Sequence, residues 1–376
     1  MSKKKVYGLK EMTALKAVPA PNLSYEPPRP KKYNPPIALV GCGGVSPRHL
    51  EAYREMGLNV VALCDRHHER AEERRRAFFP SAAIYTDYWE MLKRDDIEVV
   101  DITTHPKDRN DQIREALRAG KHVLSQKPFV MDLDLGERLV ELAEKKGVQL
   151  AVNQNGRWAP HFSYVRQAIA KGLIGEVSAA HLAVHWDHEW IQSTRFNKLH
   201  HIVLYDFGIH WFDIVHCLMN GRKAKKVFST LTRAGYQKSK PPLLGQSMIE
   251  YEGGQASVVF NAITKFGHLD HTFVSGSLGT ISSGGRDLTH QKVSLYTHKG
   301  VATPRLRGTW FVEGFMGTMG ELLCAIEEKR QPGNSAADNL AGLALCFAAV
   351  RSAETGQPER VGNVRRVSAT TCSISI

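Results

Sequence analysis

Three side chains that can move protons, Lys127, Asp206 and His210, stand in two segments that are far apart in the chain. Oxidation of an alcohol carbon needs a base beside the hydroxyl, and a histidine with an ordinary pKa of about 6.5 can exchange that proton near neutral pH. Asp206 precedes His210 by one helical turn, so both would face one cleft if the segment is helical. Taken alone, His210 fits a core histidine bonded to the backbone better, so other features must decide.

A glycine-rich turn, Gly41-Cys42-Gly43-Gly44-Val45-Ser46, follows the apolar run at residues 37–40 and precedes a helical pattern. Gly41 permits a tight turn, and Gly43 lets the backbone approach a pyrophosphate at the positive end of the helix. Ser46 takes the third glycine position, where we expect it to cap the helix. Asp65 ends the next strand, where a carboxylate binds the ribose hydroxyls of NAD, while the adjacent Arg66 leaves NADP open. The alternative is a purely structural turn.

Histidines are crowded between residues 181 and 216, and they are His181, His185, His188, His200, His201, His210 and His216. With Asp187 and Glu189 nearby a divalent metal is conceivable, but the spacing is poor for a shared ion and we expect no metal site. Trp186 and Trp190 instead favour a substrate loop, because aromatic faces stack on the apolar faces of sugars and Arg195 can supply hydrogen bonds.

The elements that must position these residues follow two patterns. Apolar runs at residues 37–40, 60–64, 99–102, 122–124 and 149–152 alternate with helical patterns, which predicts a parallel sheet. After Trp158, alternating runs predict an antiparallel sheet, and two late helices cover residues 312–328 and 336–354. The fold class is therefore α/β, with an N-terminal Rossmann doubly wound parallel sheet and a C-terminal α+β domain with an open antiparallel sheet. We divide the chain into residues 1–36, 37–155, 156–335 and 336–376.

Composition limits the class and the partners. The chain has 376 residues and a formal net charge of +12, of which residues 1–36 carry half. Arg74 to Arg76 lie beside Glu72 and Glu73, as on a solvated helix face, and a groove-reading helix motif is missing, so we expect no nucleic-acid partner. No apolar run is long enough for a bilayer, so we expect no membrane partner. The unpaired spacing of the six cysteines indicates a reducing, cytoplasmic location.

Residues 1–36 form a proline-rich basic arm, with seven of the chain's 17 prolines between Pro19 and Pro36. Proline excludes helix and central strand here. The arm is either a loose leader or an extension laid over a neighbouring subunit, which its apolar residues Leu23, Tyr25 and Tyr33 would favour.

Four further segments resemble elements of the Gfo/Idh/MocA oxidoreductases, in order and with compatible spacing. Gly120-Lys121-His122-Val123-Leu124-Ser125-Gln126-Lys127-Pro128 is similar to their GKHV…EKP element, and Tyr205 to Asp213 contains their DxGxHxxD pattern. Arg157-Trp158-Ala159-Pro160 and Val274 to Ile281 stand where family members carry similar runs. The resemblance covers residues 37–360.

The resemblance implies Lys127 as the active-site lysine, Asp206 and His210 as acid/base residues facing a sugar or polyol, and a homo-oligomer, a dimer or tetramer assembled through the second sheet. Expected cofactor contacts are Gly41, Gly43, Gly44, Val45, Ser46, Asp65, Arg66, Thr103, Thr104, His105, Gln126, Lys127 and Asn153. Expected substrate contacts are Lys127, Arg157, Trp158, His185, Trp186, Arg195, Asp206 and His210.

Two departures from the family pattern bear on the substrate, and the second also bears on the cofactor contacts. Gln126 replaces the usual glutamate before the lysine, which would lower the pKa of Lys127 if that carboxylate normally stabilises the ammonium. Alternatively, the glutamate faces the cofactor ribose, and Gln126 replaces one acceptor. His105 comes before Pro106, and Arg109 stands near the expected histidine.

The resemblance and the residues together predict an NAD(H)-dependent oxidoreductase acting on a hydroxyl of a sugar, sugar derivative or cyclic polyol. One alternative is a glycoside-cleaving enzyme that keeps NAD bound and passes through a transient keto sugar. A second alternative is a non-catalytic regulator that senses NAD or a sugar.

Overall fold

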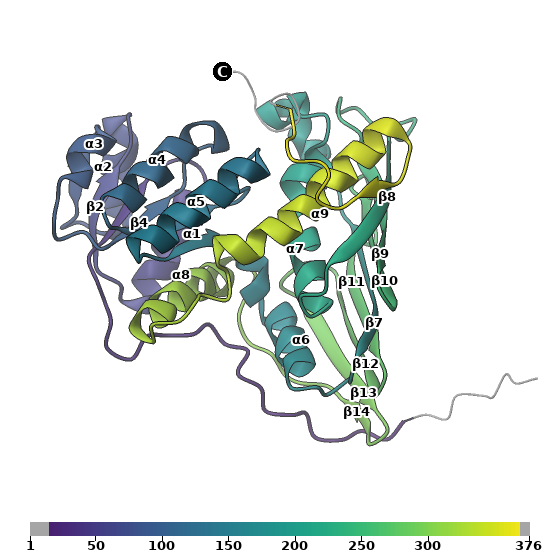
Figure 1. The fold of residues 1–376 in the computed structure, drawn as a ribbon. Coiled ribbons are helices and arrows are strands. Elements are labelled where there is room, and N and C mark those ends of the chain that lie inside the picture. The colour runs from purple at the N-terminus through teal and green to yellow at the C-terminus, as the bar shows by residue number, and fades with distance from the viewer. Residues whose placement is uncertain (1–14, 369–376) are drawn as a thin grey trace, which may run out of the picture.

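The computed structural model describes residues 15–368 and contains two sheets with helices packed between and around them (Figure 1). The first sheet is parallel and has six strands in the order β3-β2-β1-β4-β5-β6. The strands are β1 (Ile37–Val40), β2 (Val60–Cys64), β3 (Ala83–Tyr85), β4 (Val99–Ile102), β5 (His122–Gln126) and β6 (Leu150–Asn153). This order is that of a doubly wound sheet, the fold class expected from the sequence. Successive strands are added on one side of β1 as far as β3 and on its other side from β4, and ligands of such sheets bind at this switch point.

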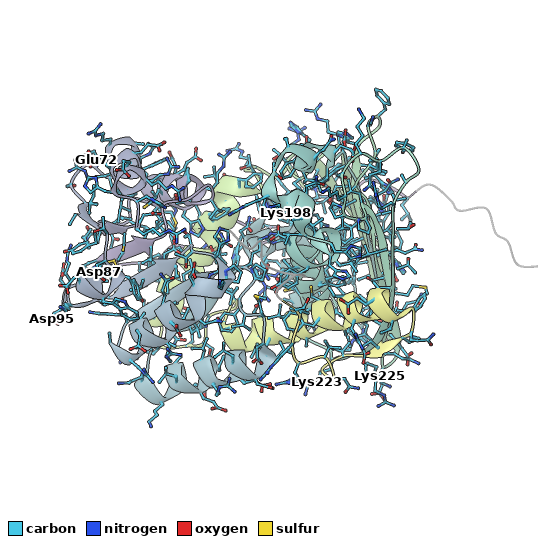
Figure 2. All side chains as sticks on the ribbon, turned by 90° about the horizontal axis from the view of Figure 1, so that it is seen from above. Glu72, Asp87, Asp95, Lys198, Lys223 and Lys225 are labelled. Atoms are coloured by element: carbon cyan, nitrogen blue, oxygen red, sulfur yellow. The ribbon has the colours of Figure 1, made fainter. Side chains whose placement is uncertain are left out.

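Helices cover both faces of the first sheet. They are α1 (Ser46–Met56), α2 (His68–Phe78), α3 (Tyr88–Leu92), α4 (Pro106–Arg118) and α5 (Leu133–Lys146). On α2, Glu72 pairs with Arg75 and Arg76 at the outer end of this domain (Figure 2), so these two arginines lie on a solvated helix face as predicted. Arg74 differs, because its side chain is 15% exposed and turns towards Ser46.

A helix from the end of the chain completes one face of the first sheet. The helix α8 (Phe311–Glu327) packs on α1, and its Phe315, Met319 and Leu322 share one buried cluster with Leu39 and Leu50. Although our division of the sequence placed this segment in residues 156–335, it belongs by its contacts to the core of the first domain.

The second sheet has nine strands in the order β14-β13-β12-β11-β7-β10-β9-β8-β15. Their bounds are β7 (Val177–His185), β8 (Ala224–Thr232), β9 (Leu244–Tyr251), β10 (Gly254–Asn261), β11 (Leu269–Gly276), β12 (Gly279–Gly285), β13 (Gln291–Thr297), β14 (Gly300–Ala302) and β15 (Glu359–Arg360). The expectation of a purely antiparallel sheet was wrong at one place, because β7 pairs in parallel with β10. A long connection leaves β7, so the later strands pair on both of its sides.

Helices cover one face of the second sheet and join it to the first domain (Figure 1). They are α6 (Pro160–Ala170), α7 (Ile209–Leu218) and α9 (Ala336–Thr355). Four short turns, η1 (Asn155–Trp158), η2 (Glu189–Ser193), η3 (Arg195–Lys198) and η4 (Val203–Phe207), lie on the connections. The helix α9 packs on α5, α7 and β8.

The described part of the arm lies along its own chain. The backbone of residues 16–18 exchanges hydrogen bonds with the β14 edge, and Glu327 of α8 accepts bonds from the backbone N–H groups of Lys31, Lys32 and Tyr33. Leu23 and Tyr25 pack against one core cluster, and Tyr33 packs against the other. Residues 15–36 are therefore held against their own chain by backbone hydrogen bonds and apolar packing, and the basic residues before position 15 lie outside the described chain.

Among residues 15–368, no helix combines the length and the apolar character that a bilayer crossing demands.

Candidate functional site

The glycine turn forms a cradle at the carboxyl edge of the first sheet. Gly41 has a φ of +95°, and a Cβ there would lie 2.9 Å from Cγ2 of Thr104, so the position requires glycine. Gly43 and Gly44 face open space, which a Cβ would begin to fill. Thr103 Oγ1 donates to the Val40 carbonyl oxygen at 3.2 Å and ties β4 to this turn. An approaching pyrophosphate fits the open side of the turn, at the positive end of α1.

Ser46 does not cap the helix, contrary to our expectation. The helix begins at Ser46 itself, and its hydroxyl donates to the Gly43 carbonyl oxygen at 2.7 Å. Nε of Arg74, from α2, donates to the same hydroxyl at 3.2 Å. Ser46 thus closes the turn, and Val45 provides the N-cap position through its backbone alone.

Asp65 follows β2 and is tied to the turn. Its Oδ2 accepts from the Cys42 N–H at 2.7 Å, and its Oδ1 accepts from the His67 N–H at 2.8 Å. Arg66 is exposed beside it. The carboxylate therefore stands at the rim of the cradle with a fixed orientation.

We expect the protein to bind NADH at least about tenfold more tightly than NADPH, because a 2′-phosphate beside Asp65 would be repelled and about 1.4 kcal/mol suffices for that ratio. Fluorescence titration with both nucleotides measures it. Arg66→Ala is the matched variant, and it should weaken NADPH binding only. Tighter binding of NADPH would refute the assignment of Asp65.

Lys127, Asp206 and His210 come together between the two domains. Nζ of Lys127 lies 2.8 Å from the backbone oxygen of Asp206 and 3.5 Å from its Oδ1. Asp206 belongs to the π-helical turn η4, which runs directly into α7 through Gly208, and His210 lies in the first turn of α7. A Cβ on Gly208 would meet the carbonyl oxygens of Val203 and Leu204 at 2.6 Å, which explains the glycine in this motif.

The electrostatic environment keeps His210 neutral. Burial, and then the charge of Lys127, hold the pKa of His210 well below its usual value. Within residues 15–368 its Nδ1 has no hydrogen-bond partner. Its ring packs against Trp310 in an edge-to-face arrangement, with centroids 5.7 Å apart. A neutral imidazole beside an ammonium can accept a proton from a hydroxyl that the ammonium polarises.

The side chains of three expected substrate contacts, Arg157, Trp158 and His185, lie elsewhere than beside Lys127 and Asp206. Arg157 is 2% exposed and binds Asp213 with two nitrogens, so its guanidinium is committed inside the protein. Trp158 is buried against Gly317 and under Arg166. His185 ends β7, where it pairs with Leu269. It lies on the sheet face opposite to that of buried Val184, and this face points away from the helices and the site.

Two further expected substrate contacts, Trp186 and Arg195, lie on the connection that follows β7, together with aromatic residues that reach Phe207. Trp186 stacks on His188 with ring centroids 5.6 Å apart, and His188 contacts Phe207, which follows Asp206. Trp190 is 51% exposed and lies 6.2 Å from the Phe207 ring. Sequence reasoning missed Phe207 and Trp310, because neither belongs to a motif of chemically active residues.

A hydrogen bond between the domains ties this loop to the first domain. Nη1 of Arg195, in η3, lies 2.7 Å from Nε2 of His105, which follows β4. Burial, then Arg195 and Arg109, lower the pKa of His105, which therefore accepts this bond as a neutral ring. Lys198 of the same turn lies between the domains when the molecule is seen from above (Figure 2).

The other crowded histidines have separate partners. His181 bonds Ser257, His201 bonds Glu354 and His216 bonds Asp338. Between residues 15 and 368 no three His, Cys, Asp or Glu side chains are grouped closely enough to hold a metal ion.

A doubly wound parallel sheet with a glycine cradle, next to a second domain whose η4 and α7 supply an aspartate and a histidine, defines a two-domain protein of the dinucleotide-binding fold. Residues 36–154 match the model "Oxidoreductase family, NAD-binding Rossmann fold", and residues 162–282 match "GFO/IDH/MocA C-terminal domain". The chain belongs to the Gfo/Idh/MocA oxidoreductase family.

Similar proteins are enzymes of carbohydrates and related compounds by name. D-apiose dehydrogenase of Paraburkholderia graminis is 30% identical over 230 residues, which are 59% of each chain, so the match spans less than two thirds of that relative. The 1,5-anhydro-D-fructose reductase of Ensifer adhaerens is 28% identical over 82% of this chain and 93% of its own. An Agrobacterium radiobacter oxidoreductase solved with NAD+, L-tartaric acid and magnesium has a TM-score of 0.79 at 21% identity, covering 88% of this chain and 99% of that chain.

Proposed function

We propose that this protein is an NAD(H)-dependent oxidoreductase acting on a hydroxyl of a sugar, sugar derivative or cyclic polyol. The observation that carries the proposal is the pairing of Lys127 with Asp206 across the domain boundary, next to a neutral His210. The names of the similar dehydrogenases and reductases support the same substrate class.

The cradle formed by Gly41, Gly43 and Gly44, with Asp65 at its rim, would hold NAD, and the bound nicotinamide would supply the hydride acceptor. Lys127 has three N–H donors, and the Asp206 carbonyl oxygen takes one of them. A remaining donor binds the substrate oxygen and stabilises the negative charge that develops on it. His210 accepts the hydroxyl proton, and Asp206 orients Lys127 and contacts the sugar.

The aromatic rings beside Asp206 supply the flat surface that a sugar ring requires. Trp190 and Phe207 place apolar faces next to the proton-transferring groups, and Arg195 adds hydrogen-bond donors.

We expect Trp190→Ala to raise the KM for the sugar by about threefold to tenfold with little change in kcat, because a stacked ring contributes about 0.5–1.5 kcal/mol. Steady-state kinetics with saturating NAD measures this. The exposed Tyr236→Ala serves as the control. A fall in kcat at constant KM would place Trp190 in the chemistry and contradict this role.

The decisive experiment has two steps. Mass spectrometry of small molecules released by denaturing the purified protein identifies a retained dinucleotide, and a panel of sugars, polyols and glycosides with NAD then identifies turnover. Net NADH with a free sugar supports the proposal. Cleavage of a glycoside without net NADH supports the glycoside-cleaving alternative, and ligand binding without turnover supports the regulator.

We further propose a cytoplasmic homo-oligomer, a dimer or tetramer. The outer face of the second sheet exposes Met248, Leu269 and Phe273, which favours burial against another copy. The five cysteines of the described chain are free, which suits a reducing compartment. Light scattering of the purified protein tests the assembly, and a monomeric mass would refute it.

A further inference from the structure

A fully buried histidine of α1, His49, lies beneath the cofactor cradle with polar partners on both ring nitrogens. On one side, its Nδ1 is 2.7 Å from Oδ2 of Asp101, in β4. Tyr53 donates its hydroxyl to the same oxygen at 2.6 Å. Burial, then Asp101, raises the pKa of Tyr53 well above its ordinary value, so Tyr53 remains a donor. The Asp101 oxygen therefore accepts two bonds, one of them from Nδ1–H of His49.

On the other side, two amides meet Nε2 of His49. Nε2 of Gln126 lies at 3.0 Å and Nδ2 of Asn153 at 3.2 Å, and these residues end β5 and β6. The orientation of the Gln126 amide follows from chemistry, because its other end accepts the N–H of Lys127 at 2.7 Å and must be oxygen. The end facing His49 is then an NH2 group, and His49 must accept from it. His49 is accordingly neutral with its proton on Nδ1.

Gln126 therefore connects His49 to the backbone N–H of Lys127 rather than to the Lys127 ammonium. We propose that His49 is a positioning residue, which holds Gln126 and through it the backbone of Lys127, and that the network specifies an uncharged residue at position 126. This inference rests on the proposed function of Lys127. It also locates the effect of the Gln126 departure in a buried hydrogen-bond network under the site.

The variant Gln126→Glu tests whether this network positions Lys127 or only stabilises the fold. A carboxylate at position 126 still accepts the Lys127 N–H, but its second oxygen faces the Nε2 lone pair, so His49 must bind a second proton. That proton would lie among Asp101, the new carboxylate, the Tyr53 hydroxyl and the Asn153 amide, with the Phe315 ring packed on the imidazole at 4.6 Å. The additional proton held between position 126 and His49 stabilises the variant at low pH, and this stabilisation is lost when the proton leaves at higher pH. We expect kcat of the variant to fall at least about tenfold more than that of the wild type between pH 6 and pH 9.

His49→Gln supplies the matched compensation, because a glutamine amide at position 49 can either accept from the Gln126 amide or donate to a carboxylate that replaces it. The single variant H49Q should keep kcat within about threefold of the wild-type value. The variant H49L should lower kcat at least about tenfold with unchanged NADH affinity. The double variant H49Q/Q126E should regain the flat pH profile of kcat that the wild type shows. A flat profile for Q126E, or full kcat in H49L, overturns the proposal. If Q126E does not fold, the pair H49Q and H49L still decides.

Thermal unfolding of the same variants between pH 6 and pH 9 distinguishes the two ways of failing. A pH-dependent unfolding temperature in Q126E with a flat kcat profile would mean that the network is structural only, which overturns the positioning role. If no substrate is turned over by the wild type, the proposed function fails. The pH-dependent unfolding of Q126E, reversed in H49Q/Q126E, then confirms the protonation of His49.

Discussion

Lys127→Ala and His210→Ala are each expected to lower turnover by about 10²- to 10⁴-fold while NADH still binds, because each removes one partner in proton transfer and neither touches the glycine cradle. The contact of Lys127 with the Asp206 carbonyl oxygen, and the neutral His210 beside it, give the two side chains different tasks. Rapid-mixing measurement of NADH formation gives turnover, and fluorescence titration gives binding. Full activity in both variants would end the assignment.

The pH dependence of kcat should also shift in a direction that a loss of folding would not produce. Because the pKa of His210 is depressed, its neutral form persists down to pH values well below 6.5, and wild-type kcat should fall only there. Lys127 contributes to that depression, so Lys127→Ala should raise the pKa of His210 and move the acid limb of its residual activity to higher pH. The exposed Lys223→Ala is the control and should leave the profile unchanged. A shift in the opposite direction would contradict the coupling.

The order of the first sheet could be predicted because its signals are local. Each strand is a short apolar run, the glycine turn joins β1 to α1, and doubly wound sheets allow few orders for such a pattern. The central place of β7 in the second sheet could not be predicted, because it depends on pairing with β10 and β11, which lie far later in the sequence. The strands β3 and β15 are too short to give a pattern.

The candidate site shows the same division. Lys127, Asp206 and His210 stand in motifs whose residue types indicate proton transfer, so the sequence was enough to predict that they share one site. The sequence around Arg157 did not show that its side chain is buried. Its partner Asp213 is 56 residues away, and nothing in the local pattern distinguishes a buried arginine from an exposed one. His49 and Asp101 lie in ordinary helical and strand patterns, and only the packing of α1 on β4 reveals that they touch.

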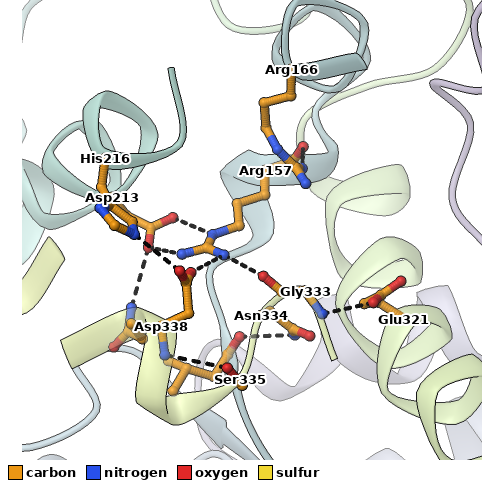
Figure 3. Close-up of polar contacts among 11 residues, drawn as sticks. Arg157, Arg166, Asp213, His216, Glu321, Gly333, Asn334, Ser335 and Asp338 are labelled. Carbon is orange, nitrogen blue, oxygen red and sulfur yellow. Dashed lines mark hydrogen bonds and ion pairs between the residues drawn. The ribbon is translucent and has the colours of Figure 1, made fainter. Parts of the chain in front are cut away.

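Asp213→Ala is expected to lower the free energy of unfolding by about 3–5 kcal/mol, the cost of removing one partner of a buried ion pair. Arg157 donates from Nε to Oδ2 of Asp213 at 2.7 Å and from Nη2 to Oδ1 at 2.6 Å, and both side chains are 2% exposed (Figure 3). Nη1 of Arg157 also pairs with Asp338 at 2.7 Å, at the start of α9. The network joins η1, α7 and α9, so its loss affects the junction of the two domains. Urea denaturation followed by fluorescence measures the change.

An exposed ion pair of the second domain provides the matched control. Glu176, whose side chain is 82% exposed, lies 3.8 Å from Arg222, and Glu176→Ala should cost at most about 1 kcal/mol because solvent screens the pair. If Asp213→Ala lowers the free energy of unfolding no more than Glu176→Ala does, the buried network stabilises the fold no more than an exposed ion pair. The double variant Arg157→Met, Asp213→Leu should recover part of the loss, because it leaves no uncompensated charge of this pair. Because Asp213 lies on α7 one turn after His210, a recovered stability with recovered kcat would show that the network acts on catalysis by holding this helix in place.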